Sequence, residues 1–252
     1  MFGFGRKVRK RSCCSACETG LVRTENQDAV FVDPSRTVLC VSDGMGGGSE
    51  GATASRVVCE ALSAVAGANG LADRTAAVAS AVNEANVRIF RYARERGYRQ
   101  MGATVVVLLF DPDDERRAAI CHVGDSRVYR IRARRAELLT RDHTVGNRLG
   151  ELAGGVRAAG LRSRSNALTH VLTRAIGARE QVEAEWNVID VAPGDRFLLC
   201  SDGVHDVVSD ERIGFLLSRS ESLSDLSALL TADVIAGGAP DNYSYVIVEI
   251  GA

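Results

Sequence analysis

Aspartates in four separate parts of this chain stand where an apolar run gives way to a turn. Asp43 and Asp202 each follow an apolar run inside a Ser-Asp-Gly sequence, in VSDGMGGG and LLCSDGVHD. Asp125 and Asp241 stand beside turn residues, in HVGDSR and APDN. A short carboxylate with glycine backbone beside it offers the hard oxygen ligands that Mg²⁺ and Mn²⁺ prefer. We therefore expect folding to draw these loops into one acidic cluster.

The chemistry of such a cluster follows from its charge. Clustered carboxylates repel one another, and each costs several kcal/mol to desolvate unless it is compensated. Two divalent cations about 3.5–4 Å apart would compensate them and would lower the pKa of a shared water toward neutrality, which suits in-line attack on phosphorus. The RTENQDA stretch adds Asp28 as a further carboxylate and Arg23 as a guanidinium that matches phosphate oxygens. No pair of histidines at helical spacing accompanies the aspartates, which disfavours a zinc hydrolase.

The elements that must position these residues follow an α+β order. Helical patterns at 49–67 and 73–97 precede a run of strands, and two more helices at 209–219 and 223–236 precede a last strand. Strand-like patterns cover 13–22, 29–32, 37–41, 104–110, 118–123, 127–131, 137–139, 182–190, 195–200 and 243–250. Because helices and strands do not alternate as βαβ units, we expect helices covering sheets built mostly from hairpins. Candidate helix caps are Asp73, Ser209 and Ser222.

Composition fits one large domain. The chain has 252 residues, of which 46% are hydrophobic. Residues 1–11 carry five basic residues and no acid, so we expect a basic flexible tail there and a single catalytic domain over 12–252. The remainder has 26 basic against 32 acidic residues, a net charge of −6. A Gly-, Arg- and Ser-rich stretch at about 143–168 is expected to form a short helix and a flap at the rim of the body.

Cysteine usage and hydropathy favour a cytoplasmic protein. Seven cysteines are an odd number, and we expect them to be reduced thiols. Four of them lie in apolar runs and three cluster in the first strand without a second Cys/His pair for zinc. The first four are Cys40, Cys59, Cys121 and Cys200, and the other three are Cys13, Cys14 and Cys17. We expect no signal peptide and no membrane span, since no run of about 20 apolar residues occurs.

Eight stretches together resemble the metal-dependent protein phosphatase family, the type 2C serine/threonine phosphatases, in its compact bacterial form. Each signal alone is weak, because Asp-Gly is a common turn dipeptide, but all eight occur in the family's order over residues 23–250. They are RTENQDA, VSDGMGGGSEG, MGATVVV, HVGDSRVY, TRDHT, LTRAIG, LLCSDGVHD and GAPDNYSYVIVEI. The resemblance implies a four-layer α-β-β-α sandwich of two antiparallel sheets. It also implies hydrolysis of phosphoserine and phosphothreonine by a metal-bridging water, without a phosphoenzyme.

The resemblance also implies a set of metal ligands. Asp43 would bridge two Mn²⁺ or Mg²⁺ ions, and the carbonyl of Gly44 would bind one of them. Asp202 and Asp241 would bind the other ion or its waters, and Asp28 would act mainly through a metal-bound water.

Three further implications concern neighbouring residues. Asp125 and Asp206, with Asp202, match a third and weaker metal site of the family. Arg23 would hold the substrate phosphate, so that Arg23, Asp43 and Asp202 form the expected catalytic set. Asn242 would order the loop near Asp241.

Two positions depart from the family pattern. Gln27 stands where many eukaryotic members have a carboxylate, which removes a potential water-mediated metal anchor. Met45 stands where some members have a histidine that protonates the leaving alkoxide, a function typically worth about 10²–10⁴-fold. His143 is expected either to supply that proton or to hold the loop before the flap, and His122 is expected in the core. His170 and His205 receive no function.

The leading hypothesis is a metal-dependent serine/threonine phosphatase that opposes bacterial Ser/Thr kinases. Its expected partners are phosphorylated proteins, among them such kinases, their substrates and forkhead-associated-domain proteins, and the chain is expected to be a monomer. One alternative is a pseudophosphatase that only binds phosphoproteins. Another is a two-metal phosphodiesterase or nuclease, but that would need a basic groove, and the body of the chain is net acidic. We therefore expect no nucleic-acid partner.

Overall fold

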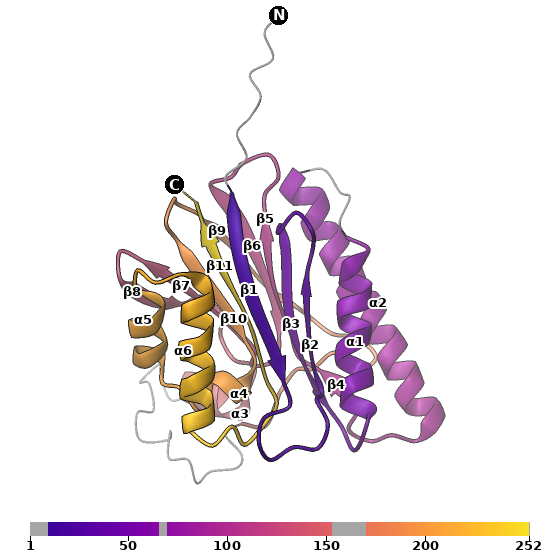
Figure 1. Cartoon of the computed structure of the whole chain (residues 1–252). Coiled ribbons are helices and arrows are strands. Elements are labelled where there is room, and N and C mark those ends of the chain that lie inside the picture. Colours follow the sequence, from indigo (N-terminus) through magenta and orange to yellow (C-terminus); the bar gives the residue numbers. More distant parts are fainter. Residues whose placement is uncertain (1–9, 66–69, 153–169, 252) are drawn as a thin grey trace, which may run out of the picture.

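The computed structural model of the chain describes residues 10–65, 70–152 and 170–251. Two antiparallel sheets face each other, and helices cover both outer faces (Figure 1). The first sheet has the strand order β1-β11-β10-β7-β8, and the second has β2-β3-β5-β6-β9 with β4 paired to β3. This arrangement confirms the predicted four-layer α+β sandwich.

Hairpins join β2 to β3, β5 to β6 and β7 to β8, whereas the other pairings bring together strands that are distant in the chain, so the sheets are not built mostly from hairpins as the sequence predicts. The first sheet contains β1 (Arg11–Glu18), β7 (Arg127–Arg132), β8 (Arg135–Leu138), β10 (Arg196–Cys200) and β11 (Tyr243–Ile250). The second contains β2 (Asp28–Val32), β3 (Val38–Met45), β4 (Gly102–Ala103), β5 (Val105–Phe110), β6 (Arg117–Val123) and β9 (Glu185–Asp190).

The helices form the two outer layers. Helices α1 (Glu50–Ser63) and α2 (Gly70–Arg96) cover the second sheet, while α5 (Asp210–Leu217) and α6 (Leu223–Ala236) cover the first (Figure 1). Two short helices, α3 (Val145–Leu152) and α4 (Asp202–His205), lie at the end of the sandwich where the loops of both sheets meet.

Three apolar layers hold the sandwich together, and β3 illustrates the reason for its continuous apolar run. Val38 and Cys40 face α1 and α2, whereas Leu39 and Val41 face the opposite sheet, because alternate side chains of a strand point to opposite faces. A strand buried on both faces must be apolar at every position. The same holds for β5, whose six residues are all buried.

Several element boundaries differ from the predicted ones. Strand β1 begins at Arg11, which is buried, so Arg11 belongs to the domain and not to the predicted tail; residues 1–9 of that tail lie outside the described residues. Helix α2 begins at Gly70, which puts Asp73 in its first turn instead of at its cap. Ser209 and Ser222 cap α5 and α6 as predicted, since each side chain accepts a backbone N–H of the first turn. The predicted flap overlaps α3, and residues 153–169 are not described.

All seven cysteines are free thiols, as expected. Burial, together with the nearby Asp28 carboxylate, raises the pKa of Cys17 to about 11, and burial raises the pKa of Cys14. These thiols are therefore protonated and unreactive at neutral pH. Within the described ranges, no helix is both long and apolar enough to span a membrane.

Candidate metal centre

The site starts from the pairing of β2 with β3. In this antiparallel pair Asp28 stands directly opposite Asp43, so two carboxylates face each other at the end of the sheet. Asp28 is buried, and the hydroxyl of Ser201 donates to its Oδ2 at 2.8 Å. Its other oxygen, Oδ1, is buried without any hydrogen-bond donor. A buried carboxylate oxygen left in this state is costly unless a ligand fills the gap.

The first sheet contributes a carboxylate at the end of β10. Asp202 is the first residue of α4, directly after the strand, and its carboxyl group contacts that of Asp43. Two glycines allow these close approaches. A Cβ on Gly203 would lie 1.9 Å from the carbonyl oxygen of Asn242, and a Cβ on Gly44 would lie 2.0 Å from that of Gly51. The repeated Ser-Asp-Gly sequence is therefore required by packing as well as by the position of its carboxylate.

Loops from both sheets complete a cleft of about 260 Å³ around these groups. Of the predicted ligands, Asp43, Gly44, Asp202, Asp125 and Asp241 line it, and Asp28 lies buried against Asp43. The other lining residues are Arg23, Gln27, Met45, Gly46, Thr104, His170, Leu172 and Asn242.

The electrostatics of the cleft record the crowding of carboxylates. Burial raises the pKa of Asp28 to about 7 and that of Asp125 to about 7, with the charge of Asp202 adding to both. Burial and the charges of Asp28, Asp202 and Asp125 raise the pKa of Asp43 well above its ordinary value. Burial also raises the pKa of Asp202. The folded chain thus holds these groups together at the cost of unrelieved negative charge.

Arg23 brings a positive charge to the carboxylates of the cleft. Its guanidinium lies 2.7 Å from Oδ2 of Asp241, and its side chain is 55% exposed. Asn242 anchors the loop that carries Arg23, because its side-chain amide donates to the carbonyls of Thr19 and Glu25 at 2.9 and 2.8 Å. Its Oδ1 accepts the backbone N–H of Gln27 at 2.9 Å. This is the ordering function that the sequence assigns to Asn242.

Asp206 is not among the residues that line the cleft, although its charge helps burial to raise the pKa of Asp202. It follows α4, and its two carboxylate oxygens each lie 3.4 Å from an imidazole, that of His205 on one side and that of His170 on the other. The Nε2 of His205 is 3.0 Å from the carbonyl oxygen of Asp125. His170, to which the sequence analysis assigns no function, therefore lines the cleft. It lies in an irregular segment whose sequence has no periodicity that could have predicted this position.

The two departures from the family pattern both face the cleft. The side chain of Gln27 donates to the carbonyl of Gly48 and so holds the glycine-rich turn after β3. Met45, the last residue of β3, lines the cleft and has no proton to donate. His143 does not line the cleft.

The donor set fits a divalent cation. The cleft combines hard carboxylate oxygens from both sheets, a glycine carbonyl at the strand end and a buried carboxylate oxygen, Asp28 Oδ1, that no donor reaches. Hard oxygens are the ligands that Mg²⁺ and Mn²⁺ select. A cation would relieve both the repulsion and the unsatisfied oxygen.

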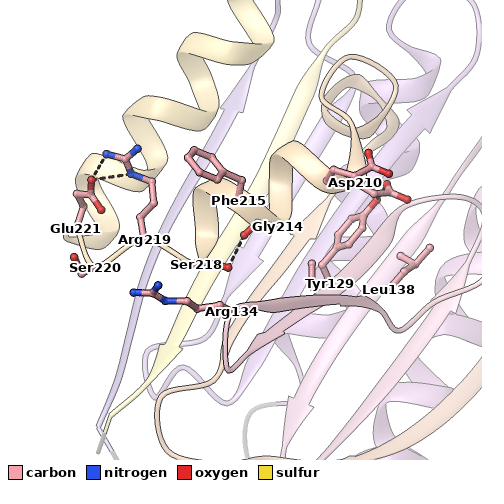
Figure 2. Close-up of a pocket in the computed structure, with 12 residues that line it drawn as sticks. Tyr129, Arg134, Leu138, Asp210, Gly214, Phe215, Ser218, Arg219, Ser220 and Glu221 are labelled. Carbon is pink, nitrogen blue, oxygen red and sulfur yellow. Dashed lines mark hydrogen bonds and ion pairs between the residues drawn. The ribbon is translucent and has the colours of Figure 1, made fainter.

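A larger groove of about 770 Å³ lies elsewhere, between α5 and the β7–β8 hairpin (Figure 2). Two of its three carboxylates are already paired: Asp210 accepts from the hydroxyl of Tyr129 at 2.8 Å, and Glu221 binds Arg219 at 2.7 Å. Because each of these two carboxylates already has a hydrogen-bond donor, this groove lacks the repulsion among carboxylates that is present in the cleft.

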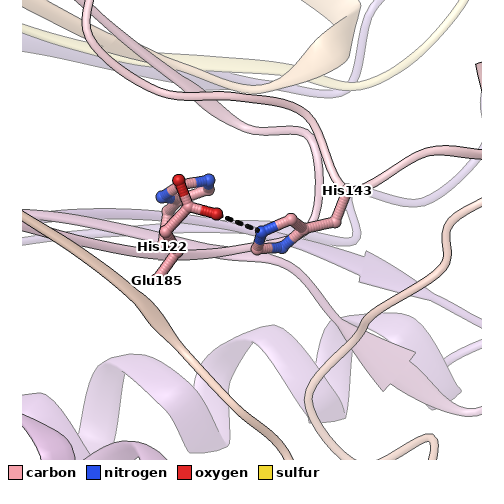
Figure 3. Close-up of side chains that lie close together, drawn as sticks. All are labelled: His122, His143 and Glu185. Carbon is pink, nitrogen blue, oxygen red and sulfur yellow. Dashed lines mark hydrogen bonds and ion pairs between the residues drawn. The ribbon is translucent and has the colours of Figure 1, made fainter. Parts of the chain in front are cut away.

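A trio of possible ligands, His122, His143 and Glu185, lies outside the cleft with ligand atoms within 4.8 Å of one another (Figure 3). The backbone N–H of Gly124 donates to Nδ1 of His143 at 3.2 Å, which assigns the ring proton to Nε2. That nitrogen lies 3.2 Å from Oε2 of Glu185 and 3.3 Å from a guanidinium nitrogen of Arg174, whose positive charge disfavours a metal cation there. The contacts instead fix the loop before α3 to the turn that carries Asp125, the second of the two functions expected for His143. His122 is buried, as predicted.

Three comparisons with known proteins agree with this geometry. Residues 22–233 match the family model of protein phosphatase 2C. The chain is 32% identical over 234 residues to the serine/threonine protein phosphatase PstP of Mycobacterium tuberculosis. That match covers 92% of this chain and 44% of PstP, so the chain spans less than half the length of this relative.

Another relative is matched over nearly its whole length. The protein phosphatase PhpP of Streptococcus pneumoniae is 28% identical over 240 residues, which cover 92% of this chain and 95% of PhpP. The solved catalytic domain of PstP, a complex with two manganese ions, superposes with a TM-score of 0.81 at 30% identity, covering 96% of this chain and 99% of that one.

Proposed function

Because the chain belongs to the protein phosphatase 2C family, we propose that it is a serine/threonine protein phosphatase that depends on Mn²⁺ or Mg²⁺. The observation that carries the proposal is the contact of Asp43 with both Asp28 and Asp202, which brings carboxylates from two sheets together. A protein that only bound phosphoproteins would gain nothing from this repulsion, so the cluster speaks against the pseudophosphatase alternative.

The cleft residues would hold two ions. Asp43, the carbonyl of Gly44, Asp202 and Asp241 would hold them, and Asp28 would act mainly through a bound water. The manganese complex of the PstP catalytic domain supports this number of ions. When bound, the ions activate a water and neutralise charge on the reacting phosphate.

The proposed site also has room for a third ion beside Asp125. Asp125, Asp202 and Asp206 would hold it, with His205 fixing the backbone of Asp125. Asp206 already faces two imidazoles, so we propose that this ion binds more weakly than the other two.

The chain's own groups would orient the substrate. Arg23 would bind the phosphate through its guanidinium fork, and the ion pair with Asp241 would aim that fork at the metal ligands. Met45 offers no acid for the leaving alkoxide, so a water in the open cleft would supply that proton.

The test is phosphate release from a phosphothreonine peptide. We expect release to require added Mn²⁺ and to collapse in Asp43→Asn and Asp202→Asn. Asp73→Asn is the matched control, because Asp73 is exposed in the first turn of α2 and far along the chain from the cleft residues. Metal-independent turnover, or full activity in both cleft variants, would overturn the proposal.

Phosphorylated proteins are the substrates that this activity implies. We propose that these substrates include bacterial Ser/Thr kinases, the targets of such kinases and forkhead-associated-domain proteins. We also propose that the chain acts as a monomer in the cytoplasm. Support for the bacterial setting comes from the relatives in Mycobacterium and Streptococcus.

A further inference from the structure

The loop that carries Arg23 also carries two exposed aliphatic side chains. Leu21 and Val22 precede Arg23 directly, and they are 65% and 67% exposed. Among the large exposed apolar side chains of the described ranges, these two form the only pair adjacent in sequence. Single exposed aliphatic residues need no explanation, whereas apolar groups gathered at a binding site do.

A rigid backbone holds this pair in solvent. The N–H of Leu21 donates to the carbonyl of Ala239 at 2.9 Å. Gly20 has a φ of +77°, and a Cβ there would lie 2.2 Å from the carbonyl oxygen of Asp241. The loop therefore packs against the 239–242 loop at Gly20 and Leu21, and the exposure of Leu21 and Val22 is a property of the fold.

A second segment adds apolar groups at the same cleft. Val171 is 46% exposed, and its neighbour Leu172 lines the cleft. The carbonyl of Val171 accepts the N–H of Val145 at 2.9 Å, which holds this segment against α3. We call Leu21, Val22 and Val171 the apolar rim; it stands beside a cleft whose interior is dominated by carboxylates.

We propose that the apolar rim binds the residues next to the phosphorylated residue, so that the substrates are extended phosphopeptides with apolar neighbours. The inference rests on the proposed function, in which Arg23 binds the phosphate. Consecutive residues are about 3.8 Å apart, so Leu21 and Val22 are within reach of the residues that flank a phosphate held by Arg23. Acidic neighbours are disfavoured, because a carboxylate placed against the aliphatic side chains of the rim would lose hydration without gaining a hydrogen-bond donor.

The experiment compares three phosphothreonine peptides of equal length with the manganese-loaded chain. The residues on both sides of the phosphothreonine are Leu and Val, Ser and Gln, or Asp and Glu. We expect kcat/KM to be about tenfold higher for the apolar peptide than for the Ser/Gln peptide, the lower end of what an apolar contact contributes to specificity, and lowest for the acidic one. Equal values for the three, or preference for acid, would overturn the inference. If no peptide releases phosphate, the proposed function itself fails.

Variants separate a binding contact from a structural one. In Leu21→Ser and Val22→Ser we expect the ratio of kcat/KM between the apolar and Ser/Gln peptides to fall toward one. Loss of folding would lower both values together and leave that ratio unchanged. Val188→Ser is the matched control, because Val188 is a 57% exposed valine on β9 outside the cleft lining, and its ratio should equal that of the parent. A ratio that stays at the parent value in both rim variants would refute the binding contact.

Discussion

Strand β2 has a buried aspartate at each end, and the surroundings shift the pKa values of the two carboxyl groups in opposite directions. Asp33, just after the strand, is 2% exposed and accepts the backbone N–H groups of Ser35, Thr37 and Val38 at 3.1, 2.5 and 2.6 Å. Burial alone would raise the pKa of Asp33, but these donors and the hydroxyl of Ser35 lower it. At the other end, burial, with the charge of Asp202 added, raises the pKa of Asp28 to about 7.

The difference separates a structural carboxylate from one that awaits a ligand. Around Asp33 the chain supplies enough donors to satisfy both oxygens, so the charge stabilises the turn between β2 and β3. Around Asp28 one oxygen has no donor, and the neighbouring groups are Asp43 and Asp202. We infer that burial alone does not mark a functional aspartate, whereas burial without donors does.

The largest expected effect is the loss of activity in Asp43→Asn. Removal of this ligand should lower kcat/KM on a phosphothreonine peptide by about 10³-fold, because metal ions contribute several kcal/mol of charge stabilisation. The melting temperature measured in chelator should stay the same or rise, since the variant loses one of several repelling carboxylates. A clear fall in the metal-free melting temperature would mean that Asp43 is structural after all, and would break the comparison with Asp33.

The converse change is Asp33→Asn. It should lower the free energy of unfolding by about 2–4 kcal/mol, because an amide cannot satisfy the N–H donors that the carboxylate accepts. Urea denaturation in chelator measures this loss, and calorimetry should find Mn²⁺ affinity unchanged. Weakened Mn²⁺ binding in the folded variant would contradict the assignment of a structural function to Asp33 and a metal-binding function to Asp28.

The sequence identified the functional end of β2 better than the structural end. The repeated strand-Asp-Gly pattern predicted that Asp43 and Asp202 would meet, and both do contact each other. The predicted bounds of α6 and β11 also match, because a serine cap and an uninterrupted apolar run are local signals.

Other features depend on contacts that no local pattern contains. Asp33 stands in the turn sequence Asp33-Pro34-Ser35, which does not reveal its donors, since they reach the carboxylate only when the chain folds back on it. The pairing of Asp28 opposite Asp43 requires the strand register, which a turn sequence alone did not give. Asp206 was grouped with the metal ligands by its motif, yet its position beside His170 and His205 depends on a distant, irregular segment. The single turn of α4 was too short to show periodicity.

The pH dependence of stability should also differ between the two ends. The raised pKa of Asp28 means that the folded metal-free chain binds its proton more tightly than the unfolded chain. That contribution is fully present below about pH 4, the ordinary aspartate pKa, and is lost as the pH rises through about 7. The lowered pKa of Asp33 has the opposite sign, so its contribution is present above about pH 4 and is lost in stronger acid.

Melting temperatures between pH 4.5 and 8 measure this contrast. In chelator, the melting temperature of the parent chain should fall as the pH rises toward 7, and Asp28→Asn should reduce that slope. Asp33→Asn should be less stable throughout the range and should keep the slope. A parent chain whose stability in chelator does not fall toward neutral pH would show that the acidic cluster is not strained.

The smallest expected effects come from removing one hydroxyl at each end. Ser201→Ala takes a donor from Asp28, and Ser35→Ala takes one from Asp33. Because supporting groups around metal ligands typically change metal affinity by 10–100-fold, Ser201→Ala should weaken Mn²⁺ binding about tenfold. Ser35→Ala should leave Mn²⁺ binding unchanged and cost about 1 kcal/mol of stability, since the backbone donors to Asp33 remain. Calorimetry gives the Mn²⁺ affinity of each variant, and urea denaturation gives its free energy of unfolding. Equal Mn²⁺ affinities in Ser201→Ala and Ser35→Ala would mean that Ser201 serves only the packing between β10 and β11.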